Sequence, residues 1–147
     1  MDAAKARHLA IGWLARREHS SAEVIAKLAR KGCAAEIAAQ VADRLAAEGY
    51  LSDERLAEAV VRNRRRRGYG PMRIRKDLLQ KGLAADAVAR WTEAEDWLAE
   101  LQRARRKKFG DHTPQSYAER AKQARFLQRR GFTYEQIQQA LNSRSVD

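Results

Sequence analysis

The stretch DLLQKGLAAD, residues 77–86, has the pattern of one helix that ends, a glycine turn and a second helix that begins. A leucine stands four residues before Gly82, a lysine directly precedes the glycine, and Asp86 follows four residues after it. A cation is favourable at the negative end of a helix dipole, glycine readily takes the left-handed conformation that ends a helix, and an acid is favourable in a first turn. The stretch therefore predicts a helix–turn–helix joint centred on Gly82.

The same pattern occurs twice more in the chain. KLARKGCAAE at 27–36 is centred on Gly32, and FLQRRGFTYE at 126–135 is centred on Gly131. The three turn glycines are 50 and 49 residues apart. A period of this length is typical of repeat proteins, in which each unit is too thin to bury its apolar face alone and stacks on its neighbours.

The segments between these joints have a helical period. Apolar pairs four residues apart, such as Ile74 with Leu78 and Ile137 with Leu141, place apolar side chains on one helix face. Only two prolines occur, and 44% of the residues are hydrophobic but only 7% aromatic, which favours helices with an alanine-rich core. Six glycines are predicted to end helices: Gly32, Gly49, Gly68, Gly82, Gly110 and Gly131.

The chain is therefore predicted to be all-α. We expect three tandem three-helix repeats, at residues 1–51, 52–92 and 93–147, that stack into one elongated, curved solenoid-like body. The pair Thr113 and Pro114 is expected to begin the long helix of the third repeat. The spacing alone leaves a compact helical bundle open as the competing architecture.

The positive charge is concentrated in two patches. The formal net charge is +11, and residues 62–82 hold nine cations against the single acid Asp77. The first set of candidate partner-binding residues is Arg64, Arg65, Arg66, Arg67, Arg73, Arg75, Lys76 and Lys81. The second set is Arg103, Arg105, Arg106, Lys107, Lys108, Lys122, Arg125, Arg129 and Arg130. A basic ridge that recurs with the repeats fits a long, repetitive, acidic partner, although a plain solvated face is the alternative.

Aromatic residues are interleaved with these cations. They are Tyr69, Phe109, Phe126, Phe132 and Tyr134. Such interleaving is typical of surfaces on which nucleic-acid bases stack. Packing is the favoured alternative, because Phe132 and Leu83 occupy the place after a turn glycine that commonly packs back on the helix end.

The sequence offers little for catalysis. The histidines His8, His19 and His112 have no metal-ligand spacing, Cys33 is the only cysteine, and no serine or cysteine lies in a nucleophile motif. We therefore expect a protein that is not an enzyme and that has no cofactor and no metal. Without a long apolar run or a signal peptide, we expect a cytoplasmic monomer with no membrane partner.

Four stretches resemble the RecX family, the bacterial regulators of the RecA recombinase. The most specific are EGYLSDERLAEAVVRNR at 48–64 and GYGPMRIRKDLLQKGL at 68–83, and RKKFG at 106–110 and FLQRRGFTYEQIQQAL at 126–141 extend the likeness, which covers residues 6–141. The chain departs from the family pattern at Leu56, where an aromatic residue is expected, and at Ser52, where an acid is more usual.

The resemblance implies tandem three-helix repeats, in agreement with the period above. It also implies a negative regulator that binds in the groove of the RecA–DNA filament and inhibits ATP hydrolysis, strand exchange and coprotease activity. The alternative reading of the same basic surface is a stand-alone nucleic-acid-binding protein. Weak contact with single- or double-stranded DNA is compatible with both.

Overall fold

The structure, a computed structural model, describes residues 1–93 and 96–142. Over these ranges the regular structure is helical throughout. The helices are α1 (Ala3–Arg16), α2 (Ser21–Arg30), α3 (Ala35–Ala47), α4 (Asp53–Arg66), α5 (Pro71–Gln80), α6 (Ala85–Glu93), α7 (Leu98–Phe109), α8 (Tyr117–Arg129) and α9 (Tyr134–Asn142).

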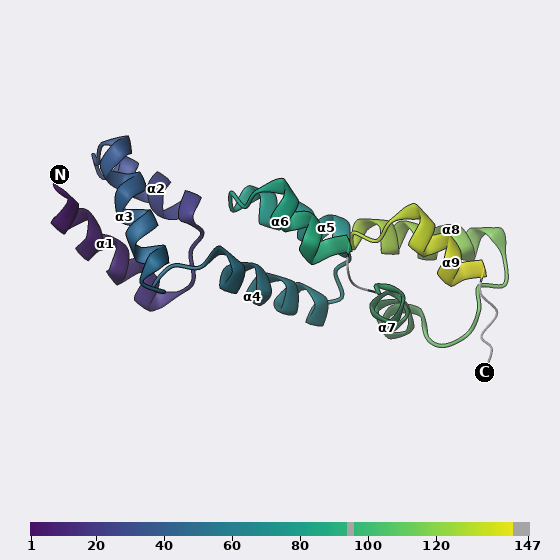
Figure 1. The fold of residues 1–147 in the computed structure, drawn as a ribbon. Helices are drawn as coiled ribbons and strands as arrows, with labels where there is room; N and C mark the ends of the chain where they lie inside the picture. The colour runs from purple at the N-terminus through teal and green to yellow at the C-terminus, as the bar shows by residue number, and fades with distance from the viewer. Residues whose placement is uncertain (94–95, 143–147) are drawn as a thin grey trace.

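The helices form three groups that follow one another along an elongated molecule (Figure 1). The most extensive helix–helix contacts lie within α1–α3, within α4–α6 and within α7–α9. The prediction of an all-α chain of three tandem three-helix repeats is thus confirmed. The alternative of a compact bundle is wrong, because each group packs mainly on itself and meets only its neighbours.

The glycine turns adopt the predicted conformation. All six glycines that were expected to end helices have a positive φ, between 81° and 97°. At two of the joints the next residue folds back: the Phe132 N–H donates to the Leu127 carbonyl at 3.1 Å, and the Leu83 N–H donates to the Leu78 carbonyl at 3.3 Å. Phe132 and Leu83 are both buried, which confirms their packing role.

Serine side chains cap the starts of α2, α4 and α8. The Ser20 hydroxyl accepts from the Glu23 N–H, and the Glu23 carboxylate accepts from the Ser20 N–H, both at 2.9 Å, so that two otherwise unpaired donors are satisfied. The prediction that Thr113 and Pro114 begin the long helix of the third repeat is wrong. That helix begins at Tyr117, because Ser116 accepts from the Glu119 N–H at 3.1 Å and so provides the cap.

Each repeat has its own apolar core, and one side chain crosses between two of them. The first core is rich in alanine, as the composition suggested. Trp97 directly precedes α7 but packs in the core of the second repeat, where it is 3% exposed. Its indole N–H donates to the Thr92 carbonyl at 2.8 Å. The start of the third group of helices is therefore fixed to the second.

The two junctions between repeats use the same contact. In each, the glycine turn of one repeat packs on the start of the second helix of the preceding repeat. At the first junction the Ser20 hydroxyl donates to the Lys81 carbonyl. At the second the Gly70 N–H donates to the Arg130 carbonyl at 2.7 Å. Ser20 and Gly70 are both N-cap residues, and Lys81 and Arg130 both precede the turn glycine, so one stacking step is used twice.

An ion pair flanks each junction, and its polarity is reversed from one junction to the other. Glu18 of the first repeat pairs with Arg55 at 2.7 Å, whereas Arg65 of the second repeat pairs with Glu100 at 2.8 Å. Arg55 and Glu100 are each the third residue of the first helix of their repeat. If the third repeat were stacked on the first, Glu100 would face Glu18, so the charges favour the native order of repeats.

His19 is buried at the turn between α1 and α2 and makes stability depend on pH. Its side chain lies 3.1 Å from the Arg17 carbonyl and 3.2 Å from the Lys27 ammonium, and the residue is 2% exposed. Burial lowers the pKa of His19 below its ordinary value of 6.5, and the positive charges of Arg17 and Lys27 lower it further, whereas the hydrogen bond with the Arg17 carbonyl opposes the shift. The unfolded chain then binds a proton more readily than the folded one, so the free energy of unfolding is expected to fall as the pH falls below about 6.5.

Urea unfolding between about pH 7.5 and about pH 5 measures this effect. The variant His19→Gln should lose less stability over that range than the parent protein. The matched control is His112→Gln, because His112 is exposed, and its pH dependence should equal that of the parent. A pH dependence that is the same in His19→Gln and in the parent would contradict the assignment.

Candidate interaction surface

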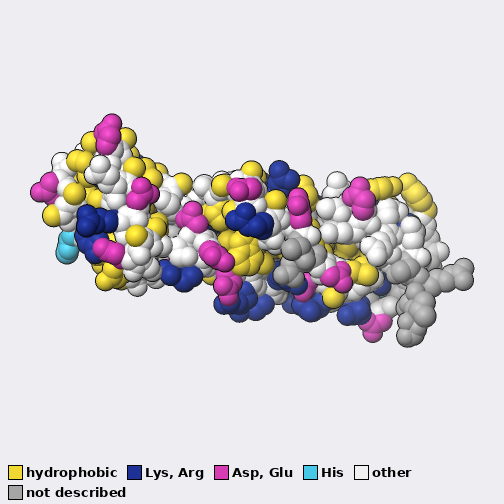
Figure 2. Space-filling view, viewed as in Figure 1, with side chains coloured by type: hydrophobic (Ala, Val, Ile, Leu, Met, Phe, Trp, Pro, Cys, Tyr) yellow, Lys and Arg dark blue, Asp and Glu magenta, His cyan; other side chains and the backbone are white. Residues whose placement is uncertain are grey.

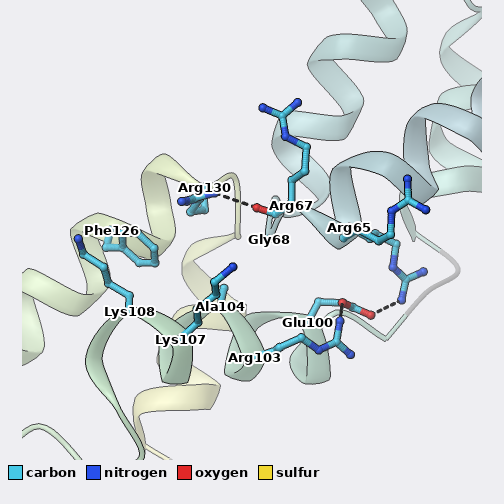
Figure 3. A pocket seen from close by; sticks show the side chains of 11 residues that line it. Arg65, Arg67, Gly68, Glu100, Arg103, Ala104, Lys107, Lys108, Phe126 and Arg130 are labelled. Atoms are coloured by element: carbon cyan, nitrogen blue, oxygen red, sulfur yellow. Dashed lines mark hydrogen bonds and ion pairs between the residues drawn. The ribbon is translucent and has the colours of Figure 1, made fainter.

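Seven of the predicted basic residues gather where the second and third repeats meet. Figure 2 shows Lys and Arg side chains along the lower edge of the molecule, over α4 and α7, with acidic and hydrophobic side chains mixed above them. A cavity of about 310 Å³ opens there between α4, α7 and α8 (Figure 3). Seven cations line it: Arg65, Arg66, Arg67, Arg103, Lys107, Lys108 and Arg130.

A second cavity, of about 360 Å³, continues the first toward α6. The two share Arg65, Arg66, Glu100 and Arg103, and the second adds Glu58, Val61, Arg62 and Trp91. We call the two adjoining cavities, with these lining residues, the basic trough. It runs across the repeat junction, with Phe126 in the wall of the first cavity and Trp91 in the wall of the second.

Small residues lie where the end of α4 meets α7. A side chain at Gly68 would place its Cβ 3.7 Å from the Cβ of Ala104. On α7 Arg103 and Lys107 are four residues apart and lie on one helix face. On α4 consecutive arginines point in different directions, so only part of the run faces the trough.

Glu100 is the acid that holds the floor of the trough together. Its carboxylate accepts from Arg65 at 2.8 Å and from Arg103 at 2.7 Å, and its side chain is only 11% exposed. The Arg65 guanidinium also lies over the Trp97 ring, 4.9 Å from the centroid. Arg65 therefore joins the two repeats as well as lining the trough. Glu100 compensates Arg65, which is partly buried, and Arg103, which is exposed.

Arg66, Lys107 and Lys108 are exposed cations of the trough. Like charges held close together repel, and an anion bound between them removes that repulsion. A cavity with seven cations and one acid is accordingly suited to an acidic protein surface or to phosphate groups.

The aromatic residues of this region are held by arginines. The Tyr69 ring lies 5.6, 4.6 and 5.0 Å from the guanidinium carbons of Arg67, Arg73 and Arg130. Arg130 also donates to the Arg67 carbonyl at 2.9 Å and lies 5.2 Å from the Phe126 centroid. These contacts fix the wall of the trough on the α8 side.

Of the aromatic residues that could stack bases, Phe126 lines the trough and packs edge-on against Phe109, with centroids 5.4 Å apart. Phe132 is 2% exposed and belongs to the core of the third repeat. Tyr134 is 73% exposed at the start of α9 and does not line the trough.

The other predicted partner-binding residues lie outside the trough. Arg64 and Arg73 both bind Asp77, at 2.7 and 3.3 Å. The Arg64 pair ties α4 to α5, whereas the Arg73 pair lies within α5. Lys81 precedes the glycine turn of the first junction. Arg75 and Lys76 on α5, and Lys122, Arg125 and Arg129 on α8, are exposed.

Arg105 and Arg106 face a different cavity, lined also by Asp111. Arg105 donates to Gln102 at 2.8 Å and to Gln123 at 3.3 Å. Its partial burial lowers its pKa, with Arg106 acting in the same direction. The structure thus brings seven of the predicted cations into one trough. That all the predicted cations form a single binding surface stays a prediction.

Three residues of this region were missed by sequence reasoning: Trp91, Trp97 and Glu100. The spacing of Glu100 and Arg103 on one helix is a local signal for their ion pair. The contact of Glu100 with Arg65, which is 35 residues earlier, has no local signal, because it depends on how two repeats stack.

Among residues 1–93 and 96–142, no group of three or more His, Cys, Asp or Glu side chains is placed to hold a metal ion. Within the same residues, each helix is too short or too polar to cross a bilayer.

Comparison with known proteins agrees with this architecture. The first, second and third three-helix domains of RecX match residues 6–45, 52–90 and 94–141. The chain is 44% identical over 143 residues to the regulatory protein RecX of Pseudomonas fluorescens strain SBW25, covering 96% of this chain and 92% of that protein. It is 43% identical over 143 residues to the regulatory protein RecX of Halorhodospira halophila, covering 96% of this chain and 89% of the relative.

Solved structures show the same fold. The crystal structure of RecX from Lactobacillus salivarius superimposes with a TM-score of 0.78 at 20% identity, covering 95% of this chain and 94% of that one. A crystal structure of a regulatory protein RecX gives a TM-score of 0.77 at 17% identity, covering 96% of this chain and 72% of that one. From the three matched domains and the identity to its relatives, the chain belongs to the RecX family.

Proposed function

We propose that this protein is a negative regulator of a RecA recombinase. It binds in the groove of the RecA–DNA filament and inhibits ATP hydrolysis, strand exchange and coprotease activity, acting as a binding protein rather than as an enzyme. Membership of a family whose members are named regulatory protein RecX supports the regulatory role. The basic trough, with eight cations and two acids at a repeat junction, is the single observation that carries the contact.

The shape of the molecule fits such a partner. A filament presents the same surface many times along its length, and an elongated array of stacked repeats can follow that surface over a distance that a compact domain cannot span (Figure 1). The positive edge over α4 and α7 complements acidic protein side chains and DNA phosphate (Figure 2). Such charge complementarity accelerates the association of the protein with the filament and fixes its orientation there.

A second candidate function is nucleic-acid binding without a recombinase. It is favoured by the aromatic side chains of Phe126 and Trp91 in the walls of the basic trough, since cationic grooves with aromatic side chains bind single strands by stacking and by phosphate contacts. The two functions differ in whether RecA is required for binding.

Titration of the protein into RecA assembled on single-stranded DNA tests the first function. We expect ATP hydrolysis to fall and filaments to shorten at well below one molecule per RecA protomer, because each elongated molecule contacts several protomers. Unchanged hydrolysis and filament length at equimolar protein would contradict this function.

The salt dependence of DNA binding without RecA tests the second function. A plot of the logarithm of the binding constant against the logarithm of the salt concentration should fall with a slope of about 0.7 to 0.9 per neutralised phosphate. Tight binding to naked DNA at physiological salt, without any effect on RecA, would favour that alternative.

A further inference from the structure

The stacking contact that joins the repeats leaves two unmatched surfaces at the ends of the molecule. Figure 1 places the α2–α3 turn at the end of the molecule where α1 begins, and the start of α8 at the opposite end. A Cβ at Gly82 would overlap Ala22 of the preceding repeat, whereas a Cβ at Gly32 would meet nothing within 4 Å. Ser20 is fully buried, whereas Ser116, the corresponding N-cap residue of the third repeat, is exposed.

We propose that these two end surfaces bind each other between copies of this chain, so that molecules associate head to tail. The glycine turn at Gly32 of one copy would pack on the start of α8 of the next copy. This places the third repeat of one copy and the first repeat of the next in the relation that adjacent repeats have within the chain. The inference concerns self-association and does not depend on the proposed function.

The groups that form the internal contact are present at both ends. Lys31–Gly32 repeats the dipeptide Lys81–Gly82, and the two glycines have φ of +92° and +87°. Ser116 accepts from the Glu119 N–H at 3.1 Å, as Ser20 accepts from the Glu23 N–H at 2.9 Å. The Ser20 hydroxyl at the same time donates to the Lys81 carbonyl. The Ser116 hydroxyl is therefore placed to donate to the Lys31 carbonyl of a second copy.

The charges at the ends are complementary. Lys5 is the third residue of α1, the position that Arg55 and Glu100 occupy in the first helices of the other repeats. Asp111 lies in the loop between α7 and Ser116, the N-cap of α8, as Glu18 lies in the loop between α1 and Ser20, the N-cap of α2. Asp111 pairs with Arg106 of its own chain at 3.8 Å, but its side chain is still 88% exposed, and Lys5 is exposed as well. Between two copies these side chains make an ion pair with the polarity of the Glu18–Arg55 pair.

An exposed aromatic residue adds apolar surface to this contact. Tyr117 follows Ser116 directly and is 87% exposed. Tyrosine is enriched among the side chains that dominate protein–protein contacts, because its ring loses much water-exposed area while its hydroxyl can keep a polar partner. Burial of Tyr117 between copies favours association.

Head-to-tail contact has a defined consequence for size. Each copy that joins leaves one end surface free, so the contact does not close and the assembly lengthens with concentration. Most extensive contacts in the chain are within repeats, so the contact between copies is small and we expect association at high protein concentration.

Sedimentation at rising concentration, combined with matched arginine variants, tests the proposal. Ala118 is the second residue of α8, as Ala22 is of α2, and it is exposed. The variant Ala118→Arg fills the place that the Gly32 turn would occupy and should weaken association by at least about tenfold. Ala47→Arg, at the exposed end of α3, is the control and should associate like the parent protein. Equal association of the two variants, or a parent mass that stays at 16.7 kDa throughout, overturns the proposal.

Disulfide trapping is a second measurement that does not require strong association. In a Cys33→Ser background, Lys31→Cys combined with Tyr117→Cys should give a ladder of dimers, trimers and longer species upon mild oxidation. Either cysteine alone can give nothing longer than a dimer and is the control. Products of the double variant that stop at the dimer, or that do not exceed those of the single variants, overturn the head-to-tail contact.

Discussion

Reversing the charge of Arg66 and Lys107 together is expected to abolish the inhibition of RecA. Both side chains are exposed cations of the basic trough, so their replacement by glutamate changes the field there without removing a core contact. An acidic partner surface that is attracted to the trough would then be repelled by it. We expect the concentration for half-inhibition of ATP hydrolysis to rise by at least about 100-fold, since like charges facing each other at an interface cost several kcal/mol.

The matched control changes the same charge elsewhere. Arg75→Glu combined with Lys122→Glu gives the same net charge, and both positions are exposed on helices outside the trough. This variant should inhibit nearly as well as the parent. Equal loss in the two double variants would indicate that net charge, and not the trough, determines binding. Full inhibition by the Arg66→Glu, Lys107→Glu variant would place the contact on another surface.

Replacing Gly131 with alanine is expected to cause a large loss of stability. Gly131 has a φ of +97°, and a Cβ there would lie 2.6 Å from both the Cβ and the backbone nitrogen of Arg73. A backbone atom cannot rotate away as a side chain can, so the third repeat must shift relative to the second. That shift breaks the hydrogen bonds from Gly70 to Arg130 and from Met72 to Gly131, at 2.7 and 2.8 Å. We expect the free energy of unfolding to fall by about 3 kcal/mol or more.

Gly32→Ala separates the two causes of this loss. Gly32 has nearly the same φ, +92°, but the space around it is open. Its replacement by alanine should therefore lower the free energy of unfolding only by the cost of holding alanine in the left-handed conformation, about 1 to 2 kcal/mol. Urea unfolding of both variants measures the difference. Losses of equal size would show that the close approach of Gly131 to Arg73 contributes nothing, and that the turn conformation alone requires glycine.

The sequence was sufficient for the local features of the fold. Three glycine turns at nearly equal spacing, flanked by a cation and an acid, predicted the repeat architecture because each of these signals acts within one or two helical turns. The start of α8 was predicted wrongly, at Thr113 and Pro114, because two local start signals lie close together in the sequence. Both Thr113–Pro114 and Ser116 are plausible starts. The structure uses Ser116, whose hydroxyl accepts from the Glu119 N–H, while the Glu119 carboxylate accepts from the Gln115 N–H.

The candidate site could be predicted only in part. The cations were visible in the sequence, but nothing local distinguishes Arg66, which faces the trough, from Arg64, which binds Asp77 at 2.7 Å within its own repeat. Trp97 looked like a residue of the third repeat, yet it packs in the second. These assignments depend on the rotation between neighbouring repeats, and the helical period does not contain that rotation.

The reversed polarity of the two inter-repeat ion pairs limits how an array of this kind can grow by gene duplication. A tandem duplicate of the middle repeat would bring Arg65 of the first copy against Arg55 of the second, two cations in the place of a pair. A duplicate of the first repeat would instead oppose Glu18 and Lys5, which attract. Internal duplications are thus tolerated unequally along the chain, and extra units are more easily gained beside the first repeat than beside the second.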